Sequence, residues 1–542
     1  MGLFSVHRYV YPVLSGLLLT AAFPRTGLDW LAWIALIPLI WPLRNVSGKE
    51  GFRLGFIAGL VHYLGLVYWL VYTMQTYGGL PVYLSVPLLF LLAAYMALYP
   101  AFFSMLVTAS ARKPLILFCL MPFAWVALEY ARSHLLSGFP WELLGYSQFQ
   151  RLHLIQISDM TGVYGVSFLI VLVNAALFIL LLHVRKSDWQ GERPGRGLTA
   201  AALATALLCL GVSALYGQKR IHTVAELTKI SPVINTAAVQ GNINQMVKWD
   251  PAFQESSIHK YVALSLSAKK NQPDLVVWPE TAAPFYFSHN IALTRIVTDG
   301  VRQTGAWFLI GSPSHELSEQ GTDYYNSAYL ISPEGEISGR FDKVHLVPFG
   351  EYVPLQKWLP FVKKIVAQIG DFKTGIQGKI LSAARFDLGV LICYEIIFPE
   401  LSAAAVKNGA DILVNITNDA WYGNSSAPYQ HFSMSVFRAV ENRRSLVRAA
   451  NTGISGFVDP AGRILQTTNL FQDAVVTEGM SVINLKTFYT RHRDLFAMLC
   501  LLTTVLYVTV VSRQRGNRFS DKVKAVHSEK GRYDGSERKK KI

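Results

Sequence analysis

Long apolar runs fill most of residues 9–216 and return near the C-terminus, and they constrain the fold of this chain more than any other feature. Charged residues make up only 16% of the 542 residues, against about 25% in soluble domains. The chain is therefore predicted to be a multi-spanning membrane protein. Six runs have about the length of a bilayer crossing: Leu54–Thr73, Val82–Ala109, Pro114–Ala131, Gly162–Val184, Leu198–Tyr216 and Leu495–Ser512.

Two shorter apolar runs, Tyr9–Phe23 and Trp30–Leu43, precede the long ones and could form a tight transmembrane hairpin or a re-entrant pair. Counting both gives eight predicted spans, seven within residues 1–220 and the eighth at 495–512. No small-residue cleavage site follows the first run, so we expect an uncleaved anchor. Residues 230–490, between the last two spans, have the composition of a soluble domain.

The positive charge of the chain indicates membrane topology rather than nucleic-acid binding. The formal net charge is +15, yet residues 231–486 carry 21 Lys+Arg and 22 Asp+Glu, while the tail 513–542 carries 11 and 4. With eight spans, this tail and every basic cluster between spans fall on one side, which the positive-inside rule identifies as cytoplasmic. The domain at 230–490 is then predicted to be extracytoplasmic, and we expect no nucleic-acid partner. The clusters are Arg44/Lys49/Arg53, Arg112/Lys113 and Arg185/Lys186/Arg193/Arg196.

Short β-rich runs alternate with helical stretches between residues 230 and 490, which predicts a two-layer or sandwiched α/β domain. The segments "SPEGEI" and "DPAGRI" place Pro and Gly between extended runs, as hairpin turns require. The predicted fold class is an α+β membrane protein that joins a helical transmembrane bundle to this domain. The β-rich runs are "INTAAVQGN", "PDLVVWPE", "AWFLIGSP", "YYNSAYLISPEG", "LGVLICYE", "ADILVNITND" and "SLVRAANTGISGFVDPAG".

Three polar residues of this domain are candidates for chemistry. Glu280 ends the apolar run "DLVVWPE", Lys343 lies in a loop rich in aromatics and prolines, and Cys393 ends the run "LGVLIC". Each has an ordinary alternative: a helix cap for the glutamate, a solvated charge for the lysine and a small core residue for the cysteine. The other cysteines lie in apolar spans, so no disulfide framework or zinc pattern can be built.

Together, a glutamate, a lysine and a cysteine supply what cleavage of an amide or ester through a thioester requires. A carboxylate of raised pKa can accept the thiol proton, and an ammonium with backbone N–H groups can stabilise the oxyanion that forms. Histidine is the competing base, as in other cysteine enzymes. His345 and His431 are available, and their spacing selects neither.

The segments "VVWPE", "DKVHLVPFGEYVPL" and "LICYE", in this order, resemble the nitrilase superfamily, whose Glu-Lys-Cys triad sits in an αββα sandwich. Within it the chain resembles the apolipoprotein N-acyltransferase family, which joins such a domain to membrane helices. The resemblance covers nearly the whole chain. Further similar segments are "GFPWELLGYSQ" (Gly138–Gln148), "VQGNINQMVKWD" (Val239–Asp250), "YYNSAYLISPEG" (Tyr324–Gly335), "NITNDAWYG" (Asn415–Gly423) and "RAANTGISG" (Arg448–Gly456).

This resemblance implies an enzyme of the bacterial inner membrane with its catalytic domain on the periplasmic side. An acyl chain would pass from the sn-1 position of a phospholipid to Cys393, and then to the N-terminal amine of a diacylglyceryl-cysteine apolipoprotein. Glu280 would be the general base, Lys343 the oxyanion stabiliser and Cys393 the nucleophile, with no metal or other cofactor. The resemblance also implies supporting roles for Glu351, Tyr394 and Glu395, and a place near the substrate path for Trp249 and Asn326.

The triad alone would equally permit a membrane-tethered amidase or nitrilase that uses water as acceptor. A transporter is disfavoured, because the spans offer few ionisable residues beyond His62 and Glu129.

Moving an acyl chain from the bilayer into water costs about 0.8 kcal/mol per CH₂, so the cysteine pocket is expected to face the membrane. The loop Ala282–Ser288 and the segment Leu355–Val366 are the predicted interfacial elements. The second of these carries Trp358, Phe361, Lys363 and Lys364, an aromatic and basic set typical of an interfacial anchor.

Overall fold

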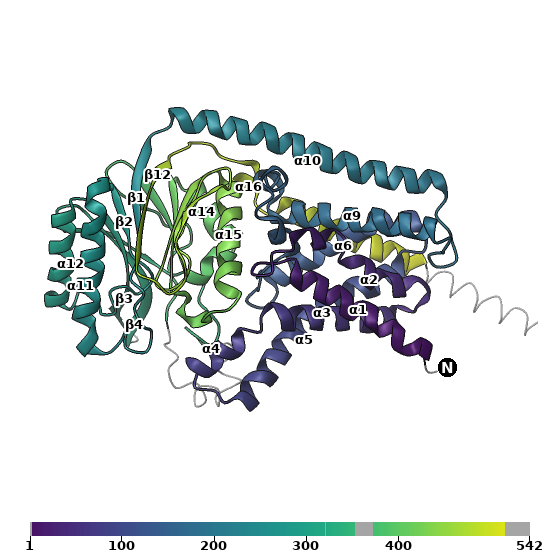
Figure 1. The fold of residues 1–542 in the computed structure, drawn as a ribbon, viewed down its shortest axis with the longest axis horizontal. Coiled ribbons are helices and arrows are strands. Elements are labelled where there is room, and N and C mark those ends of the chain that lie inside the picture. The colour runs from purple at the N-terminus through teal and green to yellow at the C-terminus, as the bar shows by residue number, and fades with distance from the viewer. Residues whose placement is uncertain (1–2, 320, 353–371, 515–542) are drawn as a thin grey trace, which may run out of the picture.

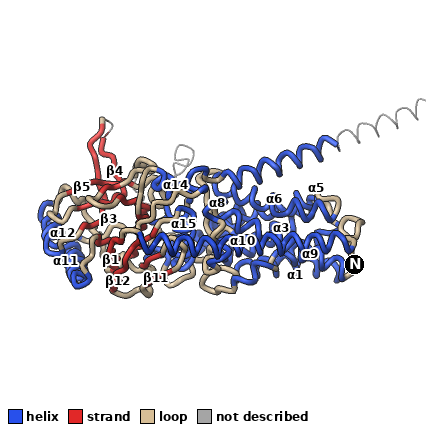
Figure 2. Tube along the Cα trace, turned by 90° about the horizontal axis from the view of Figure 1, so that it is seen from above, coloured by secondary structure: helices blue, strands red, loops and turns tan. Residues whose placement is uncertain are grey.

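Two parts of the chain follow each other along its long axis in the computed structural model, which describes residues 3–319, 321–352 and 372–514 (Figure 1). One part is a bundle of apolar helices, and the other is a two-sheet domain that lies beyond one end of the bundle. Figure 2 shows the same division from above, with the β3–β4 hairpin projecting from the domain. The bundle contains α1 (Leu3–Ala21), α2 (Leu36–Ile40), α3 (Gly48–Leu66), α4 (Leu70–Thr76), α5 (Val82–Ser110), α6 (Pro114–His134), α9 (Val163–Val184), α10 (Arg196–Ile230) and the helix Leu495–Gln514.

Within the described residues, five helices are long and apolar enough to cross a membrane, namely α5, α6, α9, α10 and Leu495–Gln514. A sixth crossing is obtained if the bent pair α3 and α4 counts as one span. The multi-spanning class is thereby confirmed. The run Tyr9–Phe23 falls largely in α1, whereas Trp30–Leu43 is divided among three short pieces, η1 (Asp29–Trp33), α2 and η2 (Trp41–Asn45). The count of eight spans stays a prediction.

The predicted span Leu54–Thr73 is not one straight helix. Its axis bends by 50° between α3 and α4. Trp69, buried at the bend, packs its ring against Trp141 at 5.0 Å and against Tyr422 at 4.7 Å between centroids. The bend is accompanied by contacts with residues that are distant in sequence. A hydropathy pattern does not indicate such contacts, so it could not predict the bend.

Helix α10 has 35 residues, so it extends well past the predicted end at Tyr216. Only two residues separate it from β1 (Val233–Gln240), the first strand of the domain. Asp159 attaches the helix to the rest of the molecule, because its carboxylate accepts hydrogen bonds from Tyr216 Oη at 2.7 Å and from Arg220 Nε at 2.7 Å. The same carboxylate accepts a bond of 2.8 Å from Arg443, next to the end of α15 (Ala427–Asn442).

The domain is a sandwich of two six-stranded sheets, with strand orders β12-β1-β2-β3-β4-β5 and β11-β10-β9-β8-β7-β6. Helices α11 (Pro251–Ala268) and α12 (Ile291–Thr304) cover the first sheet, whereas α14 (Pro399–Lys407) and α15 cover the second and lie between it and the bundle (Figure 1). This αββα order confirms the predicted fold class. The remaining strands are β2 (Leu275–Val277), β3 (Trp307–Ser318), β4 (Gly321–Ile331), β5 (Ile337–Asp342), β6 (Leu381–Ser382), β7 (Asp387–Ile392), β8 (Ile412–Thr417), β9 (Ser445–Ala450), β10 (Gly456–Val458), β11 (Ile464–Thr467) and β12 (Ala474–Ser481).

All seven predicted β-rich runs contain strands. The central strands β2 and β8 are buried along their whole length, as expected for parallel strands covered on both faces. The two predicted turns join β4 to β5 and β10 to β11, where Gly335 and Gly462 adopt φ of 81° and 85°. Glycine takes this conformation without the steric penalty of a side chain.

Candidate active site

Glu280, Lys343 and Cys393 come together where strands of the two sheets end. Glu280 follows β2, Lys343 directly follows β5, and Cys393 directly follows β7 and begins the short helix η5 (Cys393–Ile397). Their exposed fractions are 6%, 1% and 6%. Lys343 Nζ lies 3.7 Å from Glu280 Oε1, and both charges act on the pKa of the Cys393 thiol. The structure thus brings the three predicted residues into one buried centre.

Lys343 is held as an ammonium by two carboxylates. Its Nζ donates a hydrogen bond of 2.9 Å to Glu351 Oε1. Burial by itself lowers the pKa of Lys343, but the Glu351 and Glu280 carboxylates outweigh burial and raise the pKa above its ordinary value. The ammonium therefore persists at physiological pH, as an oxyanion stabiliser requires.

Asn326, on β4, links the two carboxylates. Its Nδ2 donates to Glu280 Oε1 at 2.8 Å and to Glu351 Oε1 at 2.9 Å. The backbone N–H of Asn418 donates to Glu280 Oε2 at 3.0 Å, so both oxygens of the Glu280 carboxylate are oriented. A substrate-binding role for Asn326 stays a prediction, since its observed contacts position the carboxylates.

Cys393 adopts a left-handed backbone conformation with φ of 56°, which is uncommon for a residue with a side chain. Its carbonyl accepts hydrogen bonds from Asn415 Nδ2 at 3.3 Å and from His431 Nε2 at 3.2 Å. Burial and the Glu280 charge raise the pKa of the Cys393 thiol, although Lys343 opposes them. A raised pKa favours the protonated thiol, so attack by Cys393 would require a base.

The two histidines considered as bases face other partners. His431 Nδ1 lies 3.0 Å from Asp419 Oδ1, and its Nε2 contacts the Cys393 carbonyl. His345 stacks on Phe398 with 3.7 Å between ring centroids, and burial together with Lys343 lowers its pKa to about 4. The geometry therefore favours Glu280 as the base.

Glu395 ties the segment after Lys343 to the segment before Cys393. Its Oε1 accepts the backbone N–H groups of Val344 at 2.6 Å and His345 at 2.9 Å, and its Oε2 accepts that of Ile392 at 2.7 Å. Burial raises the pKa of Glu395 to about 7, against these three hydrogen bonds. Glu395 thus holds the lysine and the cysteine in register.

The loop Gly138–Gln148 from the helical part forms one wall of the centre. Trp141 stacks on His431 at 5.6 Å, and Phe139 stacks on Tyr394 at 6.3 Å. Trp141 Nε1 also donates to Gln430 Oε1 at 2.9 Å. This loop therefore supports the residues on either side of the cysteine.

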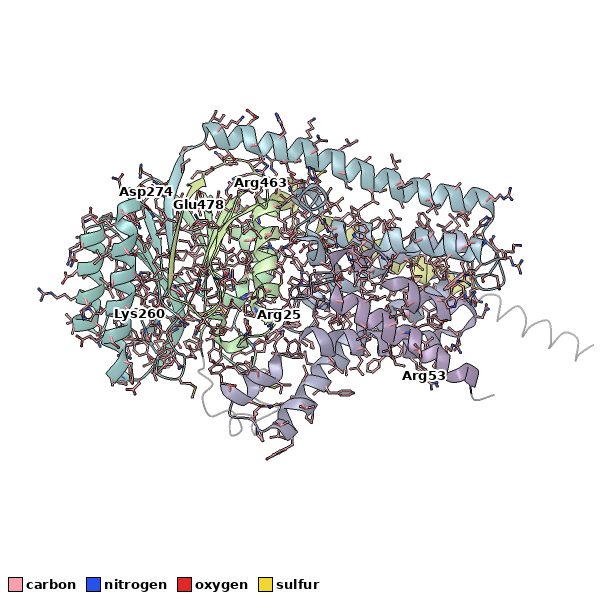
Figure 3. The ribbon with its side chains drawn as sticks, viewed as in Figure 1. Arg25, Arg53, Lys260, Asp274, Arg463 and Glu478 are labelled. Atoms are coloured by element: carbon pink, nitrogen blue, oxygen red, sulfur yellow. The ribbon has the colours of Figure 1, made fainter. Side chains whose placement is uncertain are left out.

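The start of the chain and helix α4 hold a second loop of the centre, which follows Asn418. Thr73 Oγ1 donates to the carbonyl of Trp421 at 2.8 Å. Arg25, which lies at the junction of bundle and domain in Figure 3, donates to the carbonyl of Asn424 at 2.9 Å. The bundle therefore contacts the loop whose first residue orients Glu280.

Trp249 lies at the rim of a cavity of about 620 Å³, and its exposed fraction is 51%. Phe285, Tyr286 and Pro313 line the same cavity. The prediction that Ala282–Ser288 is an interfacial loop is wrong for most of its apolar side chains, because they pack in the domain core and leave Tyr286 exposed. The segment Leu355–Val366, with its predicted anchor residues, lies outside the residues that the structure describes.

Sequence reasoning missed two contributors to the centre. One is the Asn418 backbone N–H, which no residue type could have indicated. The other is Lys248, whose exposed fraction is 1% and whose Nζ donates to the carbonyl of Glu280 at 3.0 Å. Lys248 belongs to the segment "VQGNINQMVKWD", but a single lysine in a polar segment normally indicates a solvated surface.

Comparisons with known proteins agree with both parts of the chain. Residues 15–176 match the family model for the apolipoprotein N-acyltransferase N-terminal domain, and residues 235–482 match the model for carbon-nitrogen hydrolase. The apolipoprotein N-acyltransferase of Geobacter metallireducens is 45% identical over 508 residues, covering 94% of this chain and 96% of that protein. The protein of the same name from Methylococcus capsulatus is 34% identical, with coverages of 85% and 88%.

Solved structures are also similar to part of this chain. An amidase from Nesterenkonia sp. is similar at 20% identity and a TM-score of 0.34, and the match covers 48% of this chain and 93% of the amidase.

Proposed function

Because this chain belongs to the apolipoprotein N-acyltransferase family, we propose that its acyl transfer proceeds through a thioester on Cys393, with Glu280 as general base and Lys343 as oxyanion stabiliser. The observation that carries this proposal is the convergence of the three side chains in one buried centre. The alternative is hydrolysis by a tethered amidase, and that reaction does not require contacts between the centre and the helical part.

In the first half-reaction, the Cys393 thiol gives its proton to the Glu280 carboxylate, and the thiolate attacks the sn-1 ester carbonyl of a phospholipid. The new S–C bond forms as the carbonyl electrons move to oxygen, where the Lys343 ammonium and nearby N–H groups stabilise the oxyanion. The ester C–O bond then breaks, and Glu280 returns its proton to the departing lyso-lipid oxygen.

In the second half-reaction, the free amine of a diacylglyceryl-cysteine attacks the thioester carbonyl of acylated Cys393. Glu280 accepts the amine proton, the C–S bond breaks, and the thiolate is protonated again. One cysteine can hold only one acyl group, so lyso-lipid must leave before the amine is acylated, and ping-pong kinetics follow.

The products of the purified enzyme distinguish acyl transfer from hydrolysis. With phosphatidylethanolamine labelled in the sn-1 chain and a diacylglyceryl lipopeptide, we expect the label to appear in amide linkage on the lipopeptide. The same lipopeptide with a blocked N-terminus is the control and should accept no label. Label released only as free fatty acid, with or without the free amine, would contradict the proposed acceptor.

We also propose that the domain is periplasmic and that the tail after residue 512 is cytoplasmic. The distribution of basic residues supports this orientation. Arg53, from one of the basic clusters, lies toward the end of the bundle away from the domain, whereas Lys260 lies on the far side of the domain (Figure 3). The positive-inside rule places the first of these ends in the cytoplasm.

The orientation predicts opposite accessibility for two sites in the chain. Reporter fusions after Asn271 and after Arg518 should be active on opposite sides of the membrane, the first in the periplasm and the second in the cytoplasm. Each site is fused in turn to two reporters, one that is active only in the periplasm and one that is active only in the cytoplasm, and reporter activity is measured. Equal activity of both fusions in the same compartment would overturn the topology.

A further inference from the structure

Lys248 is a second lysine buried at the catalytic centre. It lies outside the regular elements, eight residues after the end of β1 and three residues before the start of α11, and its side chain is almost fully buried. The Nζ donates to the backbone carbonyl of Glu280 at 3.0 Å. A lysine is rarely buried to this extent without a charged partner or a function.

The segment that carries Lys248 is fixed to several loops of the centre. Gln245 Oε1 accepts a hydrogen bond of 2.5 Å from the side chain of Asn418, and the Ile243 N–H donates to Asn451 Oδ1 at 2.9 Å. Trp249, the next residue, lines the cavity described above. Lys248 therefore connects the rim of that cavity to the backbone of the base.

Lys248 is the second cation beside the paired carboxylates Glu280 and Glu351. Glu280 and Glu351 carry two negative charges, and Lys343 between them carries one positive charge. Lys248 supplies the second positive charge. The balance survives each step of the first half-reaction, because the proton and then the negative charge only move among Cys393, Glu280 and the substrate oxygen. Without Lys248, the buried Glu280 and Glu351 carboxylates would have Lys343 as their one ammonium partner among these four residues, and a further negative charge on Cys393 would be less favourable.

We propose that Lys248 is a positioning residue of this enzyme: its ammonium holds the backbone of Glu280 and supplies the second positive charge that allows the Cys393 thiolate to form in a buried site. This inference rests on the proposed roles of Glu280 and Cys393 and adds a group that the Glu-Lys-Cys triad does not contain.

The electrostatics of Lys248 lead to a pH dependence. Burial lowers the pKa of Lys248 to about 8, although Glu280 and Cys393, the titratable groups that act on it most, oppose the shift. The ammonium is therefore present below pH 8 and is lost as the pH rises through 8. Lys343 keeps its proton over the same range, because its pKa is raised.

Substitution of Lys248 tests the proposal in the first half-reaction. Purified full-length enzyme is mixed with labelled phosphatidylethanolamine and no acceptor, and the thioester on Cys393 is followed as hydroxylamine-sensitive label. Lys248→Met is expected to slow thioester formation by about 10- to 100-fold, because one charge close to the thiolate is lost. Lys248→Arg should recover most of the rate. Lys269→Met is the matched control, since Lys269 Nζ also donates to a backbone carbonyl, that of Gln303 at 2.6 Å, but on an exposed helix end.

The pH profile separates a charge role from packing, and its first measurement uses the parent enzyme. Thioester formation by the parent enzyme should fall as the pH rises from 7.5 to 9.5. Lys248→Arg should remove this fall, because arginine does not lose its proton in that range. A parent profile without the fall, a Lys248→Met rate equal to that of the parent, or a Lys248→Arg profile identical to that of the parent would each overturn the proposal.

Alkylation of Cys393 by iodoacetamide at pH 7.5 supplies a readout that requires no lipid. We expect it to be slowed in Lys248→Met and near the parent rate in Lys248→Arg. If alkylation responds in this way but no phospholipid acylates the enzyme, the proposed function fails and the role of Lys248 stands. If acylation proceeds but neither measurement depends on Lys248, only the inference about Lys248 fails.

Discussion

Cys393→Ala is expected to abolish both the thioester and the transfer of acyl chains to a lipopeptide. The Cys393 thiol is the proposed nucleophile beside Glu280 and Lys343. Alanine has no side-chain atom that can form a bond to the acyl group. Cys393→Ser should fold but be nearly inactive, because Glu280 is a weak base for an alcohol, whose pKa is far above that of a thiol. The alanine variant removes one buried sulfur, so its fold should be preserved.

The measurement is incubation of the purified enzyme with labelled phospholipid in the absence of acceptor. The parent should accumulate one label per molecule, released by hydroxylamine and located by mass spectrometry on the peptide that contains Cys393. Cys500→Ala, in which a buried cysteine of the helix Leu495–Gln514 is removed, is the matched control and should label like the parent. Normal transfer to lipopeptide by Cys393→Ala would show that the cysteine is a core residue and that the mechanism is wrong.

Lys343→Met is expected to slow acylation of Cys393 by about 10²–10³-fold, the usual effect of removing one oxyanion donor. The loss should appear in the rate of thioester formation more than in phospholipid binding, because the ammonium acts on charge that develops in the transition state. Lys373→Met is the control, since Lys373 is a half-exposed lysine of the same domain that pairs with Asp323 at 3.7 Å.

The removal of Lys343 also leaves Glu351 without its cationic partner, and that change alone could destabilise the domain. The double variant Lys343→Met/Glu351→Gln neutralises the unpaired carboxylate and should recover thermal stability without recovering the rate. Acylation at the parent rate in either variant would show that the lysine is structural.

The candidate centre could be predicted in part because Glu280 and Cys393 each follow an apolar run, whereas the segment before Lys343 is polar and its role was implied by the family resemblance. Glu280 and Cys393 end buried strands, and such ends are where α/β domains present polar groups. The α/β character of the domain was predictable for the same reason, since its central strands are nearly continuous apolar runs. The four-layer αββα arrangement came from family resemblance, because local patterns do not specify how two sheets stack.

The contacts that complete the centre could not be predicted, because they join backbone groups that are distant in sequence. Lys248 donates to a carbonyl 32 residues later, and Asn418 donates its backbone N–H to a carboxylate 138 residues earlier. No side-chain pattern records such bonds. The bend between α3 and α4 could not be predicted for the same reason. Its apolar residues are compatible with a straight span, and Trp69 contacts Trp141 and Tyr422 only in the folded chain.

Helix α10 is much longer than a bilayer crossing requires. Its 35 residues span about 52 Å at 1.5 Å per residue, whereas the hydrocarbon core of a bilayer is about 30 Å thick. The helix therefore extends beyond the hydrocarbon core and ends two residues before β1. Asp159 holds the middle part of the helix through hydrogen bonds with Tyr216 and Arg220. Because a helix of fixed length leads into the domain, we expect bilayer thickness to affect the reaction: a thicker membrane should bring the lipid carbonyls closer to the domain, and a thinner one should move them away from it.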